Sequence, residues 1–376
     1  MKTKELFIRT LKKVDFTVFC VDSDQKKYFD KQFGVLQPFS SGQQGKRSIM
    51  DTILENLNLR HAPITFNYEV NKEKLEQKEI TQPCDPTYVD QMLGGWMSTP
   101  SKKGGKKSEK VEKTDNENEE VVADADKNAY KRRSPFSISA MTPLHPLLAS
   151  LVKESLMTFD RTDTNDDKIV VRNSDKKELD VEEVTAFLDK NNKKISKRNL
   201  ISGKDRANGF FKQDIAIDLS KVFRVPLSLN DVEISEATIA KMKSEGWTEV
   251  NDIYGKALQV PEKDHERIAE AIGWGIVTWR ITSNQSRTFD AMPTLSIAIS
   301  TNAYEIPSAI RGEIEEVDGK AKGKLVVDTN YPNTKVYSTN LLKAYVTDAL
   351  TSYTAIEDAA NHIKNAILDY YKADNK

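Results

Sequence analysis

The stretch that most constrains the fold is residues 33–58, FGVLQPFSSGQQGKRSIMDTILENLN, where a short apolar run turns directly into an amphipathic segment. Ser40 or Ser41 is a suitable N-cap, because its hydroxyl can accept a hydrogen bond from a free N–H of the first helical turn. Behind this cap, apolar residues recur at the spacing of one buried helical face: Ile49, Met50, Ile53, Leu54 and Leu57. The stretch therefore predicts a capped helix with a buried face.

The first turns of this helix carry Gln43, Lys46 and Arg47. Free N–H groups, the positive end of the helix dipole and two cations then point to one place, which suits a phosphate. An NTPase phosphate loop is excluded, because it needs four residues between its glycines and a Ser or Thr after the lysine. Gly42 and Gly45 have only two residues between them, and Arg47 follows the lysine. A phosphate-binding turn and an ordinary capped helix with a solvated basic end both stay open.

The composition indicates a soluble chain with a sizeable core. It has 376 residues, of which 30% are charged and 38% hydrophobic, enough for about two domains or one decorated domain. The first residues lack the apolar core of a signal peptide, and no apolar run approaches the roughly 20 residues of a membrane span, so we expect a cytoplasmic protein with no membrane contact. Cys20 and Cys84 are too few for a disulfide framework, and four scattered histidines give no metal cluster. We expect no cofactor.

The net charge is −1, but basic and acidic residues are concentrated in separate segments of the chain. Residues 102–113 carry six lysines against two acids, and residues 115–126 carry six acids and no base. Residues 101–126 are too poor in apolar residues to offset the entropy of ordering, which predicts a flexible loop. Residues 190–206 hold seven Lys or Arg against one Asp, a basic patch of the kind that binds nucleic acid.

Local patterning predicts an α+β protein with strands and helices mixed along the chain. The expected strands are residues 15–21, 65–70, 136–141, 210–222, 275–281 and 294–300, with a hairpin over 312–328 that turns at 318–319. The expected helices are residues 85–97, 147–157, 181–190, 235–245, 262–272, 339–353 and 356–371. Residues 190–206 are predicted to project from the body.

Three short motifs now resemble one family. They are FSSGQQGKRS at 39–48 before a helix, KRRSPFSIS at 131–139 entering a strand, and DIAIDL at 214–219 ending a strand, with SNQSR at 283–287 adding to the match. Together they resemble the Cas-seven family of the RAMP superfamily, the repeated backbone subunit of class 1 CRISPR effector complexes such as Cascade. The resemblance implies a modified ferredoxin-like (RRM-like) palm with long insertions, one of them a thumb-like projection.

The resemblance also implies function and partners. Copies of the subunit polymerise as a filament along a CRISPR guide RNA in a type I interference complex for antiviral defence, and present it for pairing with target DNA or RNA beside other effector subunits. The implied RNA-binding residues are Gln43, Lys46, Arg47, Arg132, Arg133, Lys193, Lys194, Lys197, Arg198, Asn284 and Arg287. Two departures from the family stand out: the glycine-rich C-terminal motif of many relatives is missing, and the charged insertion at 101–126 is unusually long.

The domains implied are residues 1–100 as the first part of the palm with the basic helix, and 101–129 as the charged insertion. Residues 130–330 form the rest of the palm, with the thumb-like insertion near 160–210, and 331–376 form C-terminal helices.

An alternative is a dispersed-site enzyme, for example a metal-dependent RNA-cleaving relative of the type III kind. Its candidate groups are Asp22, Asp24, Asp30, His145, Asp160, Asp166 and His265. No base–nucleophile spacing supports it, and a lone histidine is more often structural than catalytic. We therefore expect a binding subunit and no enzyme.

Overall fold

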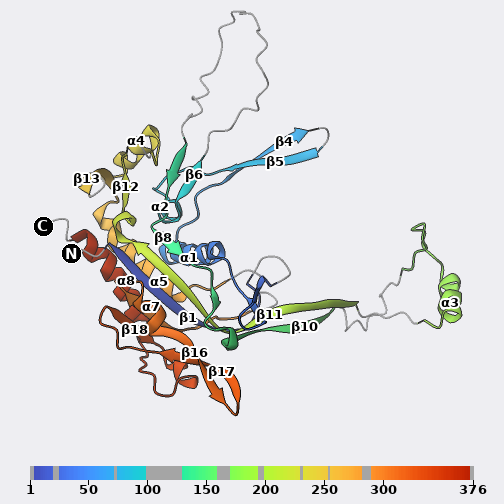
Figure 1. Ribbon diagram of the computed structural model, residues 1–376. Coiled ribbons are helices and arrows are strands. Elements are labelled where there is room, and N and C mark those ends of the chain that lie inside the picture. The colour runs from blue at the N-terminus through green and yellow to red at the C-terminus, as the bar shows by residue number, and fades with distance from the viewer. Residues whose placement is uncertain are drawn as a thin grey trace, which may run out of the picture.

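A computed structural model describes residues 4–19, 25–71, 74–98, 129–158, 170–193, 199–228, 232–252, 255–281 and 289–372 of the chain. Within these ranges the body is built on an antiparallel sheet, as Figure 1 shows, and the predicted α+β class is confirmed. The main strands, in sheet order, are β10 (Ala149–Thr158), β11 (Asn199–Asp218), β1 (Glu5–Thr17), β15 (Thr294–Ser300) and β18 (Thr334–Ser338). The short strands β8 (Phe136–Ile138) and β9 (Thr142–Pro143) also pair with β11.

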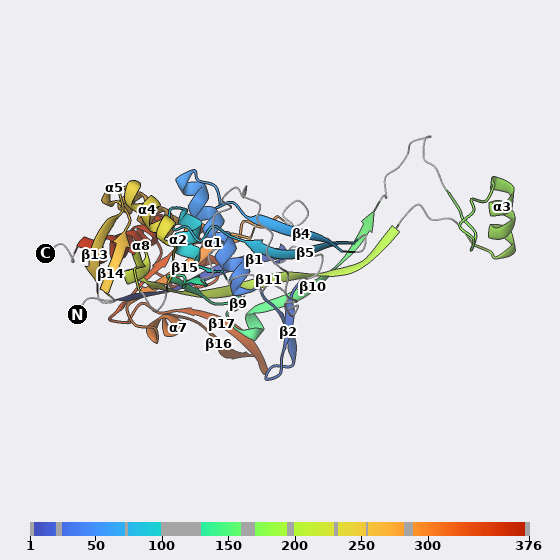
Figure 2. The same ribbon diagram turned by 90° about the horizontal axis from the view of Figure 1, so that it is seen from above.

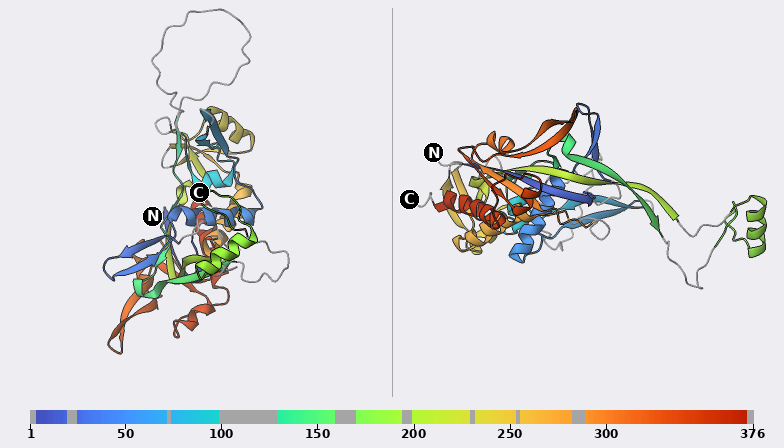
Figure 3. Two further views of the ribbon diagram at one scale, coloured as in Figure 1. Left: turned by 90° about the vertical axis from the view of Figure 1, so that its right-hand side faces the viewer. Right: turned by 90° about the horizontal axis from the view of Figure 1, so that it is seen from below.

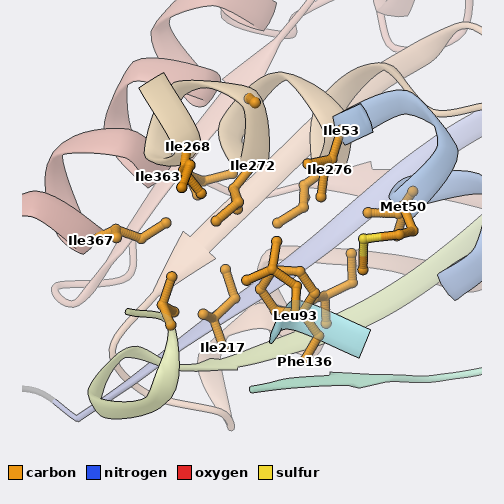
Figure 4. Packing of buried hydrophobic residues seen from close by; sticks show 14 of the residues in the cluster. Met50, Ile53, Leu93, Phe136, Ile217, Ile268, Ile272, Ile276, Ile363 and Ile367 are labelled. Carbon is orange, nitrogen blue, oxygen red and sulfur yellow. The ribbon is translucent and has the colours of Figure 1, made fainter. Parts of the chain in front are cut away.

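Three helices cover one face of this sheet: α1 (Gly42–Leu57), α5 (Glu262–Thr278) and α8 (Ala355–Lys372). Alternate residues of each strand point to this face, because successive side chains of a strand alternate between sides. Figure 4 shows Ile53, Ile276 and Ile363 from the helices packed over Ile217 of β11 in this main core. The amphipathic pattern of residues 49–57 is therefore explained by burial against the sheet.

The opposite face of the sheet is covered by a smaller set of elements. They are α7 (Glu305–Ala309), the hairpin β16 (Ile310–Val317) and β17 (Lys320–Val327), and the 3-10 helix η3 (Asn340–Ala344). Leu11 and Ala298 of the sheet pack there against Ile306 in a second cluster. Arg9 also points to this side, where its guanidinium forms a two-pronged ion pair with Asp214 at 2.6 and 2.7 Å.

Smaller units surround this core. Three are two-stranded ribbons: β2 (Lys27–Asp30) with β3 (Val35–Pro38), β4 (Thr65–Asn71) with β5 (Lys74–Thr81), and β6 (Trp96–Ser98) with β7 (Tyr130–Arg132). A further sheet joins β12 (Arg224–Pro226), β14 (Gly255–Gln259) and β13 (Thr248–Asp252), beside α4 (Glu236–Ser244). The remaining short helices are α2 (Val89–Gly94), η1 (Pro146–Leu148) and η2 (Leu219–Lys221).

Strands β10 and β11 run past the edge of the body as a long arm. Figure 2 shows the arm leaving the body, with α3 (Val181–Lys190) at its far end, and the right panel of Figure 3 shows the same. Residues 199–206 of the segment that was predicted to project belong to β11, and residues 194–198 lie outside the described part. The charged segment 101–126 also lies outside it.

Several predicted elements are confirmed with close boundaries. The helix after Ser41 is α1, residues 181–190 form α3, and Ser235 caps α4 by accepting from the Thr238 N–H at 3.1 Å. Strands β4 and β15 match residues 65–70 and 294–300, and the hairpin β16–β17 turns at Asp318 and Gly319, both with positive φ. The last predicted helix is α8.

Other predictions were wrong. Residues 147–157 were expected to be helical, but most of them form β10, because pairing with β11 outweighs local helix propensity. Residues 275–278 continue α5 rather than starting a strand. Residues 339–353 hold only the short η3 within a mostly irregular segment, and the predicted helix over 85–97 shrinks to α2.

None of the helices in the described ranges is long and apolar enough to cross a membrane.

Candidate nucleic-acid interface

The beginning of α1 is fixed on the body by its cap and by one strand-like bridge. The Ser41 hydroxyl accepts from the Gln44 N–H at 3.3 Å, which confirms the predicted cap. The neighbouring Ser40 is fully buried and exchanges two backbone hydrogen bonds of 3.0 Å with Met141, just after β8. The first turn of α1 contains no acidic residue. The positive end of the helix is therefore held in one place with no carboxylate of its own.

The two glycines of this turn serve packing on the sheet. A Cβ atom on Gly42 would lie 2.7 Å from the Ile138 carbonyl oxygen, and one on Gly45 would overlap the amide of Gln213 on β11. Larger side chains at these positions would push α1 off the sheet. The spacing of the glycines thus reflects close approach to the sheet, in agreement with the exclusion of an NTPase loop.

Lys46 lies half-buried one turn into α1. Its ammonium donates to the carbonyl oxygen of Gly94 at 2.7 Å, and burial lowers the pKa of the side chain. Within the described ranges, no carboxylate lies within ion-pair distance of Lys46. A partly desolvated cation with a neutral partner gains more from an incoming phosphate than a fully solvated one does.

Arg47 and Gln43 are exposed on the same helix. The Arg47 Nε lies 2.9 Å from Oδ1 of Asp51, one turn further along α1. The Arg47 side chain keeps 60% of its surface exposed, and such surface pairs contribute little to stability. Arg47 can therefore exchange Asp51 for a phosphate at small cost. The same Asp51 oxygen lies 2.7 Å from Nε2 of His61, which links this pair to α2 through Asp90 at 3.1 Å.

Arg133 reaches the same neighbourhood from a distant part of the sequence. A Cβ atom on Gly95 would lie 2.5 Å from the Arg132 carbonyl oxygen, so the chain around Arg133 runs directly beside Gly94 and Gly95. Lys46 bonds this same Gly94, and the Arg133 side chain is exposed. The structure thus brings the first two motifs of the sequence together.

Arg132 has a different role from the one expected. Its side chain has no exposed surface, and its guanidinium donates to Glu233 at 2.7 Å and to the carbonyl oxygens of Met92, Lys221 and Arg224. No N–H of this group is left at the surface for a phosphate. Arg133 follows directly after the end of β7, and its side chain is exposed. We therefore reassign Arg132 to a structural role.

The remaining residues that were predicted to contact RNA do not lie with Lys46, Arg47 and Arg133. Lys193 is exposed just after α3, at the far end of the arm. Lys194, Lys197, Arg198, Asn284 and Arg287 lie outside the described residues. The sequence reasoning missed the part played by Gly94, for which no local signal exists. It also missed Asp51, whose spacing from Arg47 could have shown the pair.

The groups proposed for the enzyme alternative serve local structure where they are described. Nδ1 of His145 accepts from the Leu147 N–H at 3.1 Å, and His265 is buried in a ring stack on Phe223 at 4.3 Å. Asp30 accepts from two N–H groups of its own turn. Asp22, Asp24, Asp160 and Asp166 lie outside the described residues. Across the described part of the chain, no three His, Cys, Asp or Glu side chains gather closely enough to hold a metal ion.

Among the comparisons with known proteins, only the comparison with solved structures finds similar chains. No protein-family model matches the sequence, and no curated protein matches it either. Two solved structures that are similar are chains of a CRISPR RNA-guided surveillance complex and of such a complex described as pre-nicking. For the first, the similarity covers 96% of this chain and 99% of that chain, with a TM-score of 0.42 and 7% identity. For the second it covers 79% and 78%, with a TM-score of 0.41 and 7% identity.

Similarity at this level assigns no residue of this chain a role.

Proposed function

We propose that this protein is a guide-RNA-binding backbone subunit of a class 1 CRISPR effector complex, and that it is no enzyme. The observation that carries the proposal is the meeting of two basic motifs at the beginning of α1. Lys46 and Arg47 come from one motif, Arg133 from the other, and Gly94–Gly95 lies between them. Exposed or half-buried cations around a capped helix end suit the backbone of a nucleic acid.

The strand order supports a modified ferredoxin-like palm. Strands β15, β1, β11 and β10 are neighbours in that order, and all pairs are antiparallel. In the sequence α1 lies between β1 and β10, α5 lies between β11 and β15, and both helices cover one face. A β-α-β-β-α-β succession with this order is the ferredoxin-like arrangement. The β10–β11 arm supports the thumb-like insertion expected near residues 160–210.

The chemistry of Lys46, Arg47 and Arg133 explains how the protein would bind an RNA without recognising its base sequence. Ammonium, guanidinium and backbone N–H groups all bind phosphate oxygens, and none of them distinguishes one base from another. Such contacts leave the base edges free, so a guide RNA bound here can pair with a target strand. A subunit that binds this way needs no catalytic residue and can repeat along the RNA.

The proposal is tested by RNA binding of a charge-reversed protein. The variant carries Lys46→Glu, Arg47→Glu and Arg133→Glu, and its matched control reverses three exposed lysines elsewhere, Lys320→Glu, Lys335→Glu and Lys343→Glu. Filter binding to single-stranded RNA is measured over a range of salt concentrations. We expect weaker binding and a salt slope reduced by about 0.7 per lost phosphate contact in the first variant alone. Equal loss in both variants, or in neither, would contradict a phosphate site at this end of α1.

The enzyme alternative has its own test. Incubating the purified protein with labelled RNA and divalent cations should leave the RNA intact, because a binding subunit has no cleavage step. If the protein cleaves RNA and an Asp30→Asn variant does not, the result would favour the alternative of a type III-like RNA-cleaving enzyme.

A further inference from the structure

The ring of His61 lies between two carboxylates that belong to different helices. Its Nε2 is 2.7 Å from Oδ1 of Asp51 on α1, and its Nδ1 is 3.1 Å from Oδ2 of Asp90 on α2. The two helices are in contact, as Figure 1 shows. Among the described residues, no other charged group lies within ion-pair distance of the ring. His61 therefore bridges α1 to α2 through both of its ring nitrogens.

The two contacts are satisfied together only when the ring carries two protons. An ionised carboxylate accepts hydrogen bonds and donates none, whereas a neutral imidazole has one N–H and one lone pair. The charged imidazolium donates from both nitrogens and so fits both neighbours. When the ring loses one proton, a nitrogen lone pair faces a carboxylate oxygen, and that contact becomes repulsive.

Asp90 is the more firmly held of the two carboxylates. Its side chain is 11% exposed, and its Oδ2 also accepts from the Ala62 N–H at 3.0 Å. Its Oδ1 is buried and accepts no hydrogen bond from the described residues. Leaving this group without the histidine would be costly, whereas Asp51 is 32% exposed and can turn to water. The single N–H of a neutral ring therefore stays with Asp90, and the contact with Asp51 is lost.

Asp51 transmits the loss of the proton to Arg47. The Arg47 Nε lies 2.9 Å from the same Oδ1 that His61 contacts. With His61 charged, two cations share one carboxylate, so Arg47 is held weakly. With His61 neutral, the carboxylate faces Arg47 alone, and the charge around the beginning of α1 is lower by one. Both changes make Arg47 less available to a phosphate as the pH rises.

We propose that His61 is a positioning residue that acts through its proton: the charged ring shares the Asp51 carboxylate and so frees Arg47 to bind an RNA phosphate. The inference rests on the proposed function, because it concerns the same end of α1. Histidine is the side chain that ordinarily changes its charge between about pH 5 and 8. RNA affinity should therefore fall as the pH rises through this range. By linkage, bound RNA should strengthen proton binding at His61 by the same factor.

The first experiment measures RNA affinity against pH. Filter binding to single-stranded RNA is carried out at constant ionic strength from about pH 5.5 to 8. Wild-type affinity should fall by up to about fivefold, the size of one partly exposed ion pair. His61→Gln keeps a donor but cannot become charged, so it should bind at every pH as weakly as the wild type does at the upper end. A flat wild-type profile, or a wild-type profile in His61→Gln, overturns the proposal.

Two controls remove other groups that change charge in the same range. His145→Gln removes a histidine of a different loop, and Lys12→Met removes the buried ammonium whose pKa is lowered by burial to about 7. Neither group contacts the His61 ring, so both variants should keep the pH profile of the wild type. If either substitution abolishes the pH dependence, the effect belongs to that residue and the proposal fails.

The second experiment tests whether the effect passes through Arg47. Arg47→Met should bind weakly and show no pH dependence. Asp51→Asn should bind at every pH at least as tightly as the wild type does at the lower end, because Arg47 is then always free. The matched control is Lys46→Met, which loses one cation but should keep the pH dependence, since Lys46 bonds Gly94 and not Asp51. A pH dependence that persists undiminished in Arg47→Met overturns the proposal.

The third experiment uses NMR on the full chain without RNA. With labelled histidine and arginine, the Nε–H signal of Arg47 should move with the same midpoint as the ring signals of His61. In Asp51→Asn the Arg47 signal should no longer follow the histidine. An Arg47 signal that stays constant in the wild type while His61 changes its charge would contradict the coupling.

The failures of the two proposals are distinguishable. If Arg47 follows His61 in the free protein but no RNA binds at any pH, the proposed function fails and the proton-dependent pairing stands. If the Lys46, Arg47 and Arg133 reversals weaken RNA binding but the wild-type affinity does not change with pH, the proposed function stands and this inference is wrong.

Discussion

The helices α1 and α3 both have a well-capped N-terminus, yet their surroundings differ. At α1, Ser41 caps a helix whose other face is buried in the main core, and cations surround the end. At α3, Asp180 caps a helix with no buried residue and a net negative charge. The same local chemistry therefore builds a rigid basic surface in one place and an isolated acidic one in the other. Local capping makes a helix, and the surroundings decide what it can bind.

The largest expected effect separates two adjacent arginines of the body. Arg132→Met should lower the free energy of unfolding by about 3–5 kcal/mol, because it removes the buried ion pair with Glu233 and the hydrogen bonds to three carbonyl oxygens. Arg133→Met should change it by less than about 0.5 kcal/mol while weakening RNA binding. Urea denaturation and filter binding on both variants measure this. Similar stability losses in the two would mean that Arg132 is not the buried member of the pair.

A second effect concerns the buried ammonium of Lys12. It donates to the Trp279 carbonyl oxygen at 2.8 Å and to the Thr294 hydroxyl at 2.9 Å, and burial lowers its pKa from 10.5 to about 7. Between these two values the unfolded chain binds a proton that the folded protein does not, so this group makes stability rise with pH. Below about pH 7 both states bind the proton, and this gain in the free energy of unfolding is absent.

This pH dependence is tested against Lys12→Met. The wild-type free energy of unfolding should rise relative to the variant by up to about 1.4 kcal/mol per pH unit between pH 7 and 10. Other titrating groups cancel in the difference. Two parallel curves would show that Lys12 titrates normally.

A third prediction probes the packing of α1 on the sheet. Gly45→Ala should cost about 1–3 kcal/mol, because the new methyl group meets the Gln213 amide on β11. The matched control is Gly94→Ala, where nothing lies within 4 Å of the added atom. Thermal unfolding of both variants measures the difference. Equal melting temperatures would indicate that α1 sits further from β11.

The smallest effect is expected at the tip. Asp180→Ala removes the capping box and should destabilise α3 by about 1 kcal/mol. Because α3 contributes no residue to the main core, global unfolding should stay the same, and the loss should appear only as faster amide exchange in residues 181–190. A shift of the global unfolding transition would show that α3 is coupled to the body. The two helices would then no longer differ in this respect.

Sequence patterns predicted correctly those elements that are set by residues close to one another in the chain. The cap and apolar period of α1, the capping box of α3, and the Asp318–Gly319 turn of β16–β17 are all set within a few residues. The ferredoxin-like palm, which came from a resemblance, remains part of the proposal.

Tertiary structure decided the rest. Residues 149–157 have a helical composition but lie beside β11, whose free edge they pair with. Gly275 suggested the start of a strand, yet it lets α5 continue over α1, because a Cβ atom there would overlap Ile53. Arg132 and Arg133 are identical neighbours in the sequence, and only the position of Glu233 and the surrounding carbonyl groups determines that the first is buried. Such choices depend on partners far along the chain, which a local pattern does not contain.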